Sequence, residues 1–409
     1  MRSPNLLEEI DTEMERRGIQ GLVVLGDTTL GNPDLTYVVG RNLARGGIYF
    51  KRAGCKPLLL TSVLDVLTAR EGRVEDVRTF TDFGFEKLLV QHGQAEAYPR
   101  LVLEVLTQLG VAGNVILAGR NDLAWGTHLL DKLRSLGVRI SGEPSPTILE
   151  VARATKSMSE LHDIRDVGSK TSKIVGKVMD DLRALKRRRG HLILGGRVAT
   201  VGSVKRLIST QLAIEGLTAP EGTIFAIGPS SADPHNGGIA GAEIREHKLI
   251  VFDIFPQCES GYWFDLTRTF VIGRADKRAK TLFDAVQDAQ DSVIAILKNG
   301  LSGQSAMSHA CDVIEKYGFR TVRDVYTGKS KEISSGFIHS LGHGVGLTIG
   351  ERPYLSLQNQ DPLKTSNVVT VEPGVYLPKF GGVRIEDTVH ITGRGSENLS
   401  NARKEFELN

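Results

Sequence analysis

Four short stretches in the second half of the sequence concentrate acidic and histidine side chains. They are PHNGG with His235, FDIFPQCESGYWFDLTRTF with Asp253 and Asp265, HSLGHGVGL with His339 and His343, and TVEPGVYLPKFGGVRIEDT with Glu372 and Glu386. An aspartate that ends an apolar run, as Asp253 does after KLIVF, is unfavourable to bury unless it is paired, hydrogen-bonded or bound to a metal. Carboxylates and imidazoles are ligands for divalent cations, so these stretches indicate a metal site.

Each pair of acids falls on two segments that we expect to form a β-hairpin. Asp253 ends one apolar run, Asp265 lies in GYWFDLTRTFVIG, and PQCESG is the turn between them. Glu372 ends VVTVE, and Glu386 lies in VRIEDTVHIT after the turn LPKFGG. Residues opposite one another across a hairpin lie close together, so each hairpin would bring two carboxylates within reach of one or two cations. Taken alone, acids near a turn are also explained as caps or surface features.

The stretch FIHSLGHGVGL, residues 337–347, distinguishes a metal site from ordinary turns. His339 and His343 are four positions apart, so they share a face whether the segment is a strand or a helix. Three glycines at alternate positions disfavour a regular helix and allow backbone or ligand to approach closely. Four carboxylates and one imidazole are too many ligands for a closed structural zinc site and suit a dinuclear site of hard or borderline cations.

The elements that must position these residues fall into two domains, because 409 residues exceed what one core usually supports. The boundary is expected where composition changes near ILEVARATKSMSE, which we interpret as an apolar strand followed by a long helix from about Ser157 to Arg189. This gives domains of residues 1–152 and 153–409. The basic residues KRRRG then form the favourable last turn of that helix. In the first domain, strands at GLVVLG, YVVG, GGIYF, PLLLTS and NVILAG alternate with helices, which predicts an α/β domain with a largely buried sheet.

Composition and charge exclude several classes of partner. The chain has 51 basic and 48 acidic residues, so a net charge of +3 gives no footprint for nucleic acid or an anionic membrane. Three cysteines far apart, Cys55, Cys258 and Cys311, do not form a disulfide framework and fit a reducing compartment. No stretch is apolar for the length of a bilayer, and the N-terminal SPNLLEEIDTEMERRG has the pattern of an amphipathic helix and not of a signal peptide. We therefore expect a cytoplasmic protein without nucleic-acid or membrane partners.

The second domain resembles the pita-bread metallopeptidases, the family of methionine aminopeptidase, aminopeptidase P, prolidase and creatinase, and is most similar to the Xaa-Pro peptidases. The resemblance rests on DxxxxxxxGYxxDxTRTF, HSLGHGVGL, VEPGVY and GVRIEDT, which occur in family order. The separations of His343 from Glu372 (29) and of Glu372 from Glu386 (14) are similar to those in prolidases. The first domain resembles, more faintly, the creatinase-type N-terminal domain through GDTTLGNPDLTYVVG. The implied fold is α/β (α+β), with a creatinase-like N-terminal domain followed by a pita-bread catalytic domain.

Carried onto this sequence, the resemblance implies a dinuclear peptidase site. The implied metal ligands are Asp253, Asp265, His343, Glu372 and Glu386, with Asp265 and Glu386 bridging two divalent cations, manganese or cobalt, or alternatively zinc or iron. The implied catalytic residues are Glu372 as general base, His235 and His339 near the substrate, and Arg384, whose guanidinium suits recognition of a carboxylate. The resemblance further implies hydrolysis of Xaa-Pro bonds in small peptides by a homodimer.

Two departures from the family pattern leave other functions open. Asp265 follows Asp253 by 12 positions, one more than is usual, and the addition falls in the expected turn. Relatives usually read GHGxGLxVHE where this sequence reads GHGVGLTIGE, so Gly350 stands in place of a third histidine. The alternatives are therefore a pita-bread amidohydrolase acting on a small non-peptide C–N substrate, or a non-catalytic binding module. A basic residue for a free peptide C-terminus is not identifiable, although Arg352 is a candidate.

Overall fold

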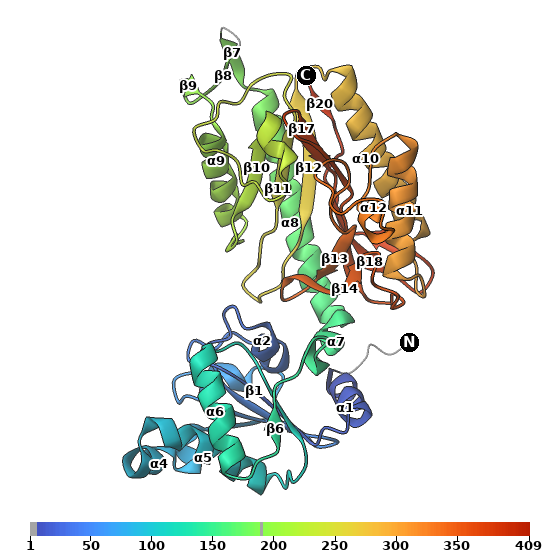
Figure 1. The fold of residues 1–409 in the computed structure, drawn as a ribbon. Helices are drawn as coiled ribbons and strands as arrows, with labels where there is room; N and C mark the ends of the chain where they lie inside the picture. The colour runs from blue at the N-terminus through green and yellow to red at the C-terminus, as the bar shows by residue number, and fades with distance from the viewer. Residues whose placement is uncertain (1–5, 189–190) are drawn as a thin grey trace. The chain divides into compact units, whose positions relative to one another are not determined.

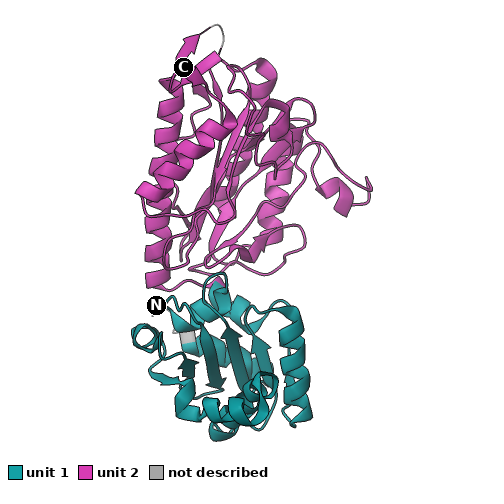
Figure 2. Cartoon of the chain, turned by 90° about the vertical axis from the view of Figure 1, so that its left-hand side faces the viewer, with its two compact units in different colours: residues 1–153 teal, residues 154–409 magenta. Residues whose placement is uncertain are grey.

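The computed structural model describes residues 6–188 and 191–409, and the chain divides into two compact units, residues 1–153 and 154–409 (Figure 2). Both units combine helices with sheets, which confirms the mixed α/β class expected from the sequence. None of the described helices has the length and apolar character that a membrane span requires.

The first unit is built on a six-stranded sheet in the order β4-β3-β2-β1-β5-β6. Its strands are β1 (Gly21–Gly26), β2 (Gly47–Arg52), β3 (Leu58–Thr61), β4 (Asp76–Thr79), β5 (Val115–Ala118) and β6 (Ile140–Ser141). Its helices are α1 (Leu6–Arg16), α2 (Pro33–Val39), α3 (Val66–Arg70), α4 (Phe85–His92), α5 (Gln94–Gln108) and α6 (Leu123–Ser135). All of β1 is buried, as a sheet covered by helices requires.

The segment YVVG, expected to be a strand, belongs instead to helix α2. Asn32 caps this helix by accepting the backbone N–H of Leu35 at 3.2 Å, and Pro33 occupies the start of the helix, where its missing N–H has no effect. Gly40 ends it in a left-handed conformation. The helix start and stop signals therefore outweigh the β propensity of three residues.

The described residues of the second unit form four sheets, and helices flank the two larger ones. Its helices are α8 (Met158–Arg183), α9 (Val201–Ile214), α10 (Lys277–Ile296), α11 (Gly303–Lys316) and α12 (Arg323–Tyr326), and α7 (Ile148–Ala154) precedes them in the chain. One sheet contains β10 (Thr223–Ile227), β11 (Ile250–Ile254), β12 (Leu266–Ile272) and β20 (Glu407–Leu408). A second has the order β14-β13-β15-β18-β19, with bounds β13 (Gly342–Val345), β14 (Ile349–Leu355), β15 (Val368–Val371), β18 (Asp387–Ile391) and β19 (Ser396–Asn398). Helix α9 contacts β10, whereas α10 and α11 contact the second sheet on the other side of the strands (Figure 1).

The boundaries of the long helix differ from the prediction. The stretch ILEVARA is helix α7 and not a strand. Helix α8 begins after Ser157, which forms a capping box with Glu160, and it ends at Arg183 instead of Arg189. Lys186–Arg188 form strand β7, which pairs with β8 (His191–Leu194), and β8 pairs with β9 (Arg197–Val198). The basic residues are thus a hairpin arm and not a helix C-terminus, and Arg189 and Gly190 lie outside the described residues.

Strands β11 and β12 form the first expected hairpin. The antiparallel register places Asp253 opposite Thr267. Asp265 comes one residue before β12, so the second strand begins five residues later than the sequence pattern suggested. Because Asp265 is two residues from Thr267, its side chain lies on the same face as that of Asp253.

Glu372 and Glu386 occupy breaks between two sheets and not one continuous hairpin. Strands β15 and β18 pair as far as Val371 and Asp387, and the next positions in this register are the two glutamates. Beyond them, β16 (Gly374–Leu377) and β17 (Gly381–Arg384) form a separate two-stranded sheet. The apolar side chains of these strands, with those of α10 and α11, form a core that includes Val371 and Ile385. The core therefore fixes the strands from one side while the glutamates point to the other.

The alternate glycines of β13 let neighbouring strands approach it. A Cβ at Gly342 would lie 2.1 Å from the carbonyl oxygen of Thr370, and a Cβ at Gly344 would lie 2.2 Å from that of Arg352. Contacts that short are impossible for a real side chain, so only glycine fits at these positions. The expectation that backbone approaches closely at this stretch is confirmed, and the approaching groups are strands β14 and β15.

Candidate metal centre

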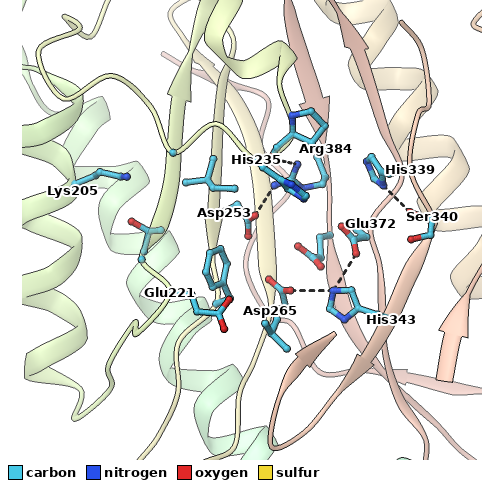
Figure 3. A pocket seen from close by; sticks show the side chains of 18 residues that line it. Lys205, Glu221, His235, Asp253, Asp265, His339, Ser340, His343, Glu372 and Arg384 are labelled. Carbon is cyan, nitrogen blue, oxygen red and sulfur yellow. Dashed lines mark hydrogen bonds and ion pairs between the residues drawn. The ribbon is translucent and has the colours of Figure 1, made fainter. Parts of the chain in front are cut away.

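A pocket of about 680 Å³ in the second unit gathers the residues that the sequence singled out (Figure 3). Its lining includes His235, Asp253, Asp265, His339, His343, Glu372, Arg384 and Glu386. The pocket volume lies in the range usual for small-molecule sites. Arg352 and Gly350 are not among its lining residues, although Ile349 is.

Three of these side chains form the tightest cluster. Asp265, His343 and Glu386 each offer one ligand atom, and these atoms all lie within 4.8 Å of one another. His343 Nε2 lies 3.7 Å from Asp265 Oδ2 and 3.4 Å from Glu372 Oε1. Figure 3 shows Asp265 and Glu372 both turned towards His343, Asp265 from the left of the view and Glu372 from above.

The hydrogen bond of His343 fixes which of its nitrogens faces the carboxylates. Nδ1 lies 3.0 Å from the carbonyl oxygen of Gly344, which can only accept, so Nδ1 carries the proton. In the neutral ring, Nε2 then presents its lone pair to Asp265 and Glu372. The Nε2 lone pair and the carboxylates repel each other unless a cation lies between them. In many metal-binding histidines, as here, a backbone carbonyl accepts the hydrogen bond from the other ring nitrogen and so orients the ring.

Several buried carboxylate oxygens lack partners. Asp253 Oδ1, Asp265 Oδ1 and Glu386 Oε1 make no hydrogen bond to any residue that the structure describes. Burial, and then the neighbouring carboxylates, raise the pKa of both Asp265 and Glu386. Burial raises the pKa of Glu372 to about 7, with Asp253 adding to the shift and Arg384 opposing it. An oxygen-rich donor set with one imidazole and unsatisfied buried oxygens fits divalent cations, because their charge would stabilise the ionised carboxylates.

Arg384, Tyr376 and His339 form a connected network beside this cluster. Arg384 donates from Nη2 to Asp253 Oδ2 at 2.6 Å and from Nη1 to the Tyr376 hydroxyl at 2.9 Å. The Tyr376 hydroxyl lies 3.0 Å from His339 Nε2, and His339 Nδ1 lies 2.7 Å from the carbonyl oxygen of Ser340. Since that carbonyl must accept from Nδ1, Tyr376 donates to Nε2. Burial lowers the pKa of His339 to about 4, so the ring is neutral and both nitrogens are engaged.

The site is supported by contacts that lock β12 to the start of β18. Thr267 donates from its hydroxyl to Glu386 Oε2 at 2.7 Å, and Thr388 donates to the carbonyl oxygen of Asp265 at 2.8 Å. Arg268 donates to the carbonyl oxygen of Glu386 at 2.7 Å. These bonds hold the Asp265 and Glu386 carboxylates side by side although 120 residues separate them in sequence.

Residues that the sequence argument did not assign a role include Tyr376, Arg268 and Lys205. Tyr376 and Arg268 lie within the quoted motifs VEPGVY and TRTF, and a buried tyrosine or arginine must find partners, which is the signal that could have identified them. Lys205 lines the pocket from helix α9, and no sequence pattern distinguishes it from other helix lysines.

Gly350, which stands where relatives have a third histidine, has a backbone conformation that a histidine would rarely adopt. Gly350 is exposed at the start of β14 and has φ +79°, a conformation that side chains other than glycine rarely adopt. The neighbouring Glu351 is buried and forms an ion pair with Lys156. Arg352 instead pairs with Asp361 at 3.1 Å.

Comparisons with known proteins agree with this geometry. The model of metallopeptidase family M24 matches residues 162–393. The Xaa-Pro dipeptidase of Pyrococcus furiosus is 38% identical over 184 residues, which are 45% of this chain and 48% of that protein, so the chain matches about half the length of this relative. The probable dipeptidase PepE of Mycobacterium tuberculosis is 26% identical over 393 residues, covering 90% of this chain and 96% of that protein.

Solved structures share the fold along nearly the whole chain. The prolidase from Pyrococcus horikoshii superimposes with a TM-score of 0.75 at 23% identity, covering 98% of this chain and 99% of that one. The X-Pro aminopeptidase from Thermotoga maritima gives a TM-score of 0.73 at 22% identity, with coverage of 98% and 99%. The pita-bread fold expected from the motifs is therefore confirmed. Because the matched region exceeds half of the chain, the protein belongs to metallopeptidase family M24.

Proposed function

We propose that this protein is a peptidase that hydrolyses Xaa-Pro bonds with two divalent cations. The observation that carries the proposal is the convergence of four carboxylates and His343 in one pocket, with three buried carboxylate oxygens unpartnered among the described residues. Relatives named Xaa-Pro dipeptidase favour a peptide over a non-peptide amide as substrate. A binding module without cations would have to tolerate the mutual repulsion of these carboxylates, which argues against that alternative.

The proposed ligands are the five side chains implied by the motifs, namely Asp253, Asp265, His343, Glu372 and Glu386. Divalent cations supply Lewis acidity there, polarising the scissile carbonyl and lowering the pKa of a water molecule. Manganese or cobalt suits the oxygen-rich donor set, and zinc or iron remains compatible with it.

Glu372 is the proposed general base. Its carboxylate lies in the pocket 3.4 Å from His343 Nε2, where it can take a proton from the attacking water and release it to the leaving nitrogen. Thr370 donates from its hydroxyl to Glu372 Oε1 at 3.2 Å and so orients the group. The leaving nitrogen of an Xaa-Pro bond belongs to a tertiary amide and needs this proton to depart as an amine.

The remaining predicted residues act on the substrate or on the ligands. His235 is exposed on the pocket loop and is proposed to contact the peptide. Arg384 holds Asp253 through Oδ2 and leaves Oδ1 for a cation. His339, with both nitrogens engaged, is a positioning residue that keeps the Tyr376 hydroxyl on Arg384.

Peptide hydrolysis after metal reloading tests the proposal. The chelated protein is reloaded separately with manganese, cobalt or zinc and assayed on Ala-Pro, Leu-Pro, a Gly-Pro-containing tripeptide and Met-Ala-Ser. We expect metal-dependent release at the Xaa-Pro bond and no cleavage of Met-Ala-Ser. Metal binding without any proline-directed hydrolysis would overturn the proposed activity.

We further propose that the working form is a cytoplasmic homodimer. The resemblance to pita-bread peptidases supports the dimer, and cysteines that are all free support a reducing compartment. Sedimentation of the protein at micromolar concentration is expected to give twice the mass of one chain, and a monomer that is fully active would contradict the dimer.

A further inference from the structure

The pocket contains a cation that the proposed mechanism does not use. Lys205 lines the pocket from α9 and is half-buried. Its ammonium makes no hydrogen bond or ion pair with any described residue, even though Glu221 lines the same pocket. Burial is the only cause that lowers the pKa of Lys205, so no nearby carboxylate balances its charge.

The other strong cation of the pocket is already satisfied. Arg384 donates to Asp253, to the Tyr376 hydroxyl, to the carbonyl oxygen of Pro234 and to the Thr267 hydroxyl. Four of its five N–H donors are therefore committed to the protein. Lys205 has three N–H donors on a flexible stem and is the group available for an anion on a bound molecule.

Lys205 lies on the wall of the pocket opposite the metal cluster. Figure 3 shows it projecting from α9, while His343 and Glu372 lie on the other side of Asp253. A Cβ placed on Gly237, in the loop that also carries His235, would lie 3.4 Å from Lys205 Nζ, so the ammonium borders the loop that faces the substrate.

Peptide geometry relates this placement to substrate length. In an Xaa-Pro dipeptide the terminal carboxylate belongs to the residue that follows the cleaved bond, so it stays beside the metal cluster. Each additional residue carries the carboxylate about 3.3–3.6 Å farther along an extended chain. An ammonium on the opposite wall therefore suits the terminus of a longer peptide.

We propose that Lys205 binds the terminal carboxylate of short Xaa-Pro peptides longer than a dipeptide. This inference rests on the proposed function, and it assigns to the same site a substrate class. The chemistry recognised is a carboxylate, and we choose the terminal one because every unmodified peptide carries it whatever its side chains.

Paired peptides test the proposal through hydrolysis. Ala-Pro, Ala-Pro-Ala and Ala-Pro-Ala-Ala are each assayed as free acid and as C-terminal amide with the metal-loaded enzyme and with Lys205→Met and Lys205→Arg. We expect the enzyme to prefer the acid at three or four residues, and Lys205→Met to raise the KM of that acid roughly 10- to 100-fold with kcat and the amide unchanged. Lys205→Arg should retain most of the preference. Lys280→Met, on the exposed face of α10, removes the same charge outside the pocket and should change nothing.

A binding measurement separates this inference from the proposed function. The same peptides are titrated calorimetrically into Glu372→Gln protein of measured metal content, with and without Lys205→Met. A preference for the acid that Lys205→Met removes supports the inference even if the enzyme hydrolyses none of the peptides, an outcome that would reject only the proposed activity. Equal binding of acid and amide, or an effect of Lys205→Met confined to Ala-Pro, would overturn it.

Discussion

Glu386 and Asp387 are neighbours in the chain, yet their carboxylates meet opposite surroundings. Asp387 is fully buried, accepts from Arg268 Nη2 at 2.7 Å, and has Lys404 Nζ at 3.1 Å. Burial alone would raise the pKa of Asp387, but Arg268 and Lys404 outweigh it and hold the pKa below its ordinary value. Glu386 faces the other carboxylates of the pocket, and its pKa is raised by burial and by their charges.

The difference is that the charge of Asp387 is neutralised by residues of the chain itself, whereas the charges of the pocket carboxylates are not. On the Asp387 side, a buried acid is balanced within the chain. On the Glu386 side, four carboxylates share one guanidinium, that of Arg384. A protein can bury such an excess of negative charge at modest free-energy cost only if cations neutralise it, and this is the physical basis of the proposed dinuclear site.

Replacing the proposed base should cause the largest effect, a loss of activity at the carboxylate cluster of the pocket. Glu372→Gln keeps the size of the side chain but cannot accept the proton, so we expect kcat for Xaa-Pro hydrolysis to fall about 10²- to 10⁴-fold. Steady-state kinetics, with metal content determined on the same preparation, measure the effect. A variant that loaded metal and hydrolysed peptide at the wild-type rate would exclude Glu372 as the base.

Replacing Arg268 should affect stability first, and activity only through the Glu386 carbonyl that Arg268 also holds. Arg268→Met leaves Asp387 buried without its main partner and should lower the free energy of unfolding by about 3–5 kcal/mol in urea titrations. The double variant Arg268→Met/Asp387→Leu removes both charges and should recover part of the loss, because the carbonyls of Glu386 and Ala402 still lack their Arg268 donor. If Arg268→Met were as stable as the wild type, Asp387 would not depend on Arg268 for its charge balance, and the contrast with the pocket carboxylates would be wrong.

The pH dependence of the stability of the metal-free protein should distinguish the carboxylates of the pocket from Asp387. The pKa of Glu372 is raised from 4.5 to about 7 in the fold, so the folded protein binds more protons than the unfolded chain between these values. Stability should therefore rise as the pH falls from about 7.5 to about 5, by a contribution on the order of 3 kcal/mol. Urea titrations in the presence of a chelator measure this slope, and Glu372→Gln should reduce it. A metal-free protein that lost stability over this interval would contradict the unbalanced cluster.

Restoring the histidine of the relatives should have the smallest effect. A Cβ at Gly350 would meet no atom within 4 Å, but the positive φ there disfavours any L side chain. Gly350→His should lower stability by about 1–2 kcal/mol and change kcat/KM by less than about tenfold. Thermal unfolding and kinetics on Ala-Pro test both values, and a large gain in rate would show that the glycine limits activity.

The sequence predicted which residues share the pocket better than it predicted the elements around them. Acids and histidines occur at motif spacings, and the family fixes where those motifs meet, so all eight expected residues line the same pocket. YVVG and ILEVARA were assigned as strands but are helical, since short apolar runs do not distinguish the two without their caps. The break at Glu372 and Glu386 was missed because it depends on strands changing sheets, which no local pattern records.

Pocket residues from outside the motifs were beyond sequence reasoning. Lys205 lies on an amphipathic helix where a lysine is ordinary, and only the packing of α9 beside β10 brings it to the pocket. The tautomers of His339 and His343 likewise depend on backbone carbonyls whose positions the side-chain pattern does not give.

Metal binding by the chelated protein tests the central claim most directly. Mn²⁺ is titrated calorimetrically into the wild type, into Glu386→Gln and into Glu397→Gln, which makes the same change at an exposed glutamate of β19. We predict two Mn²⁺ per chain for the wild type and for Glu397→Gln, and fewer for Glu386→Gln. Absence of Mn²⁺ binding by the wild type, together with peptide hydrolysis that survives chelation, would contradict the claim that the carboxylate cluster exists to hold cations.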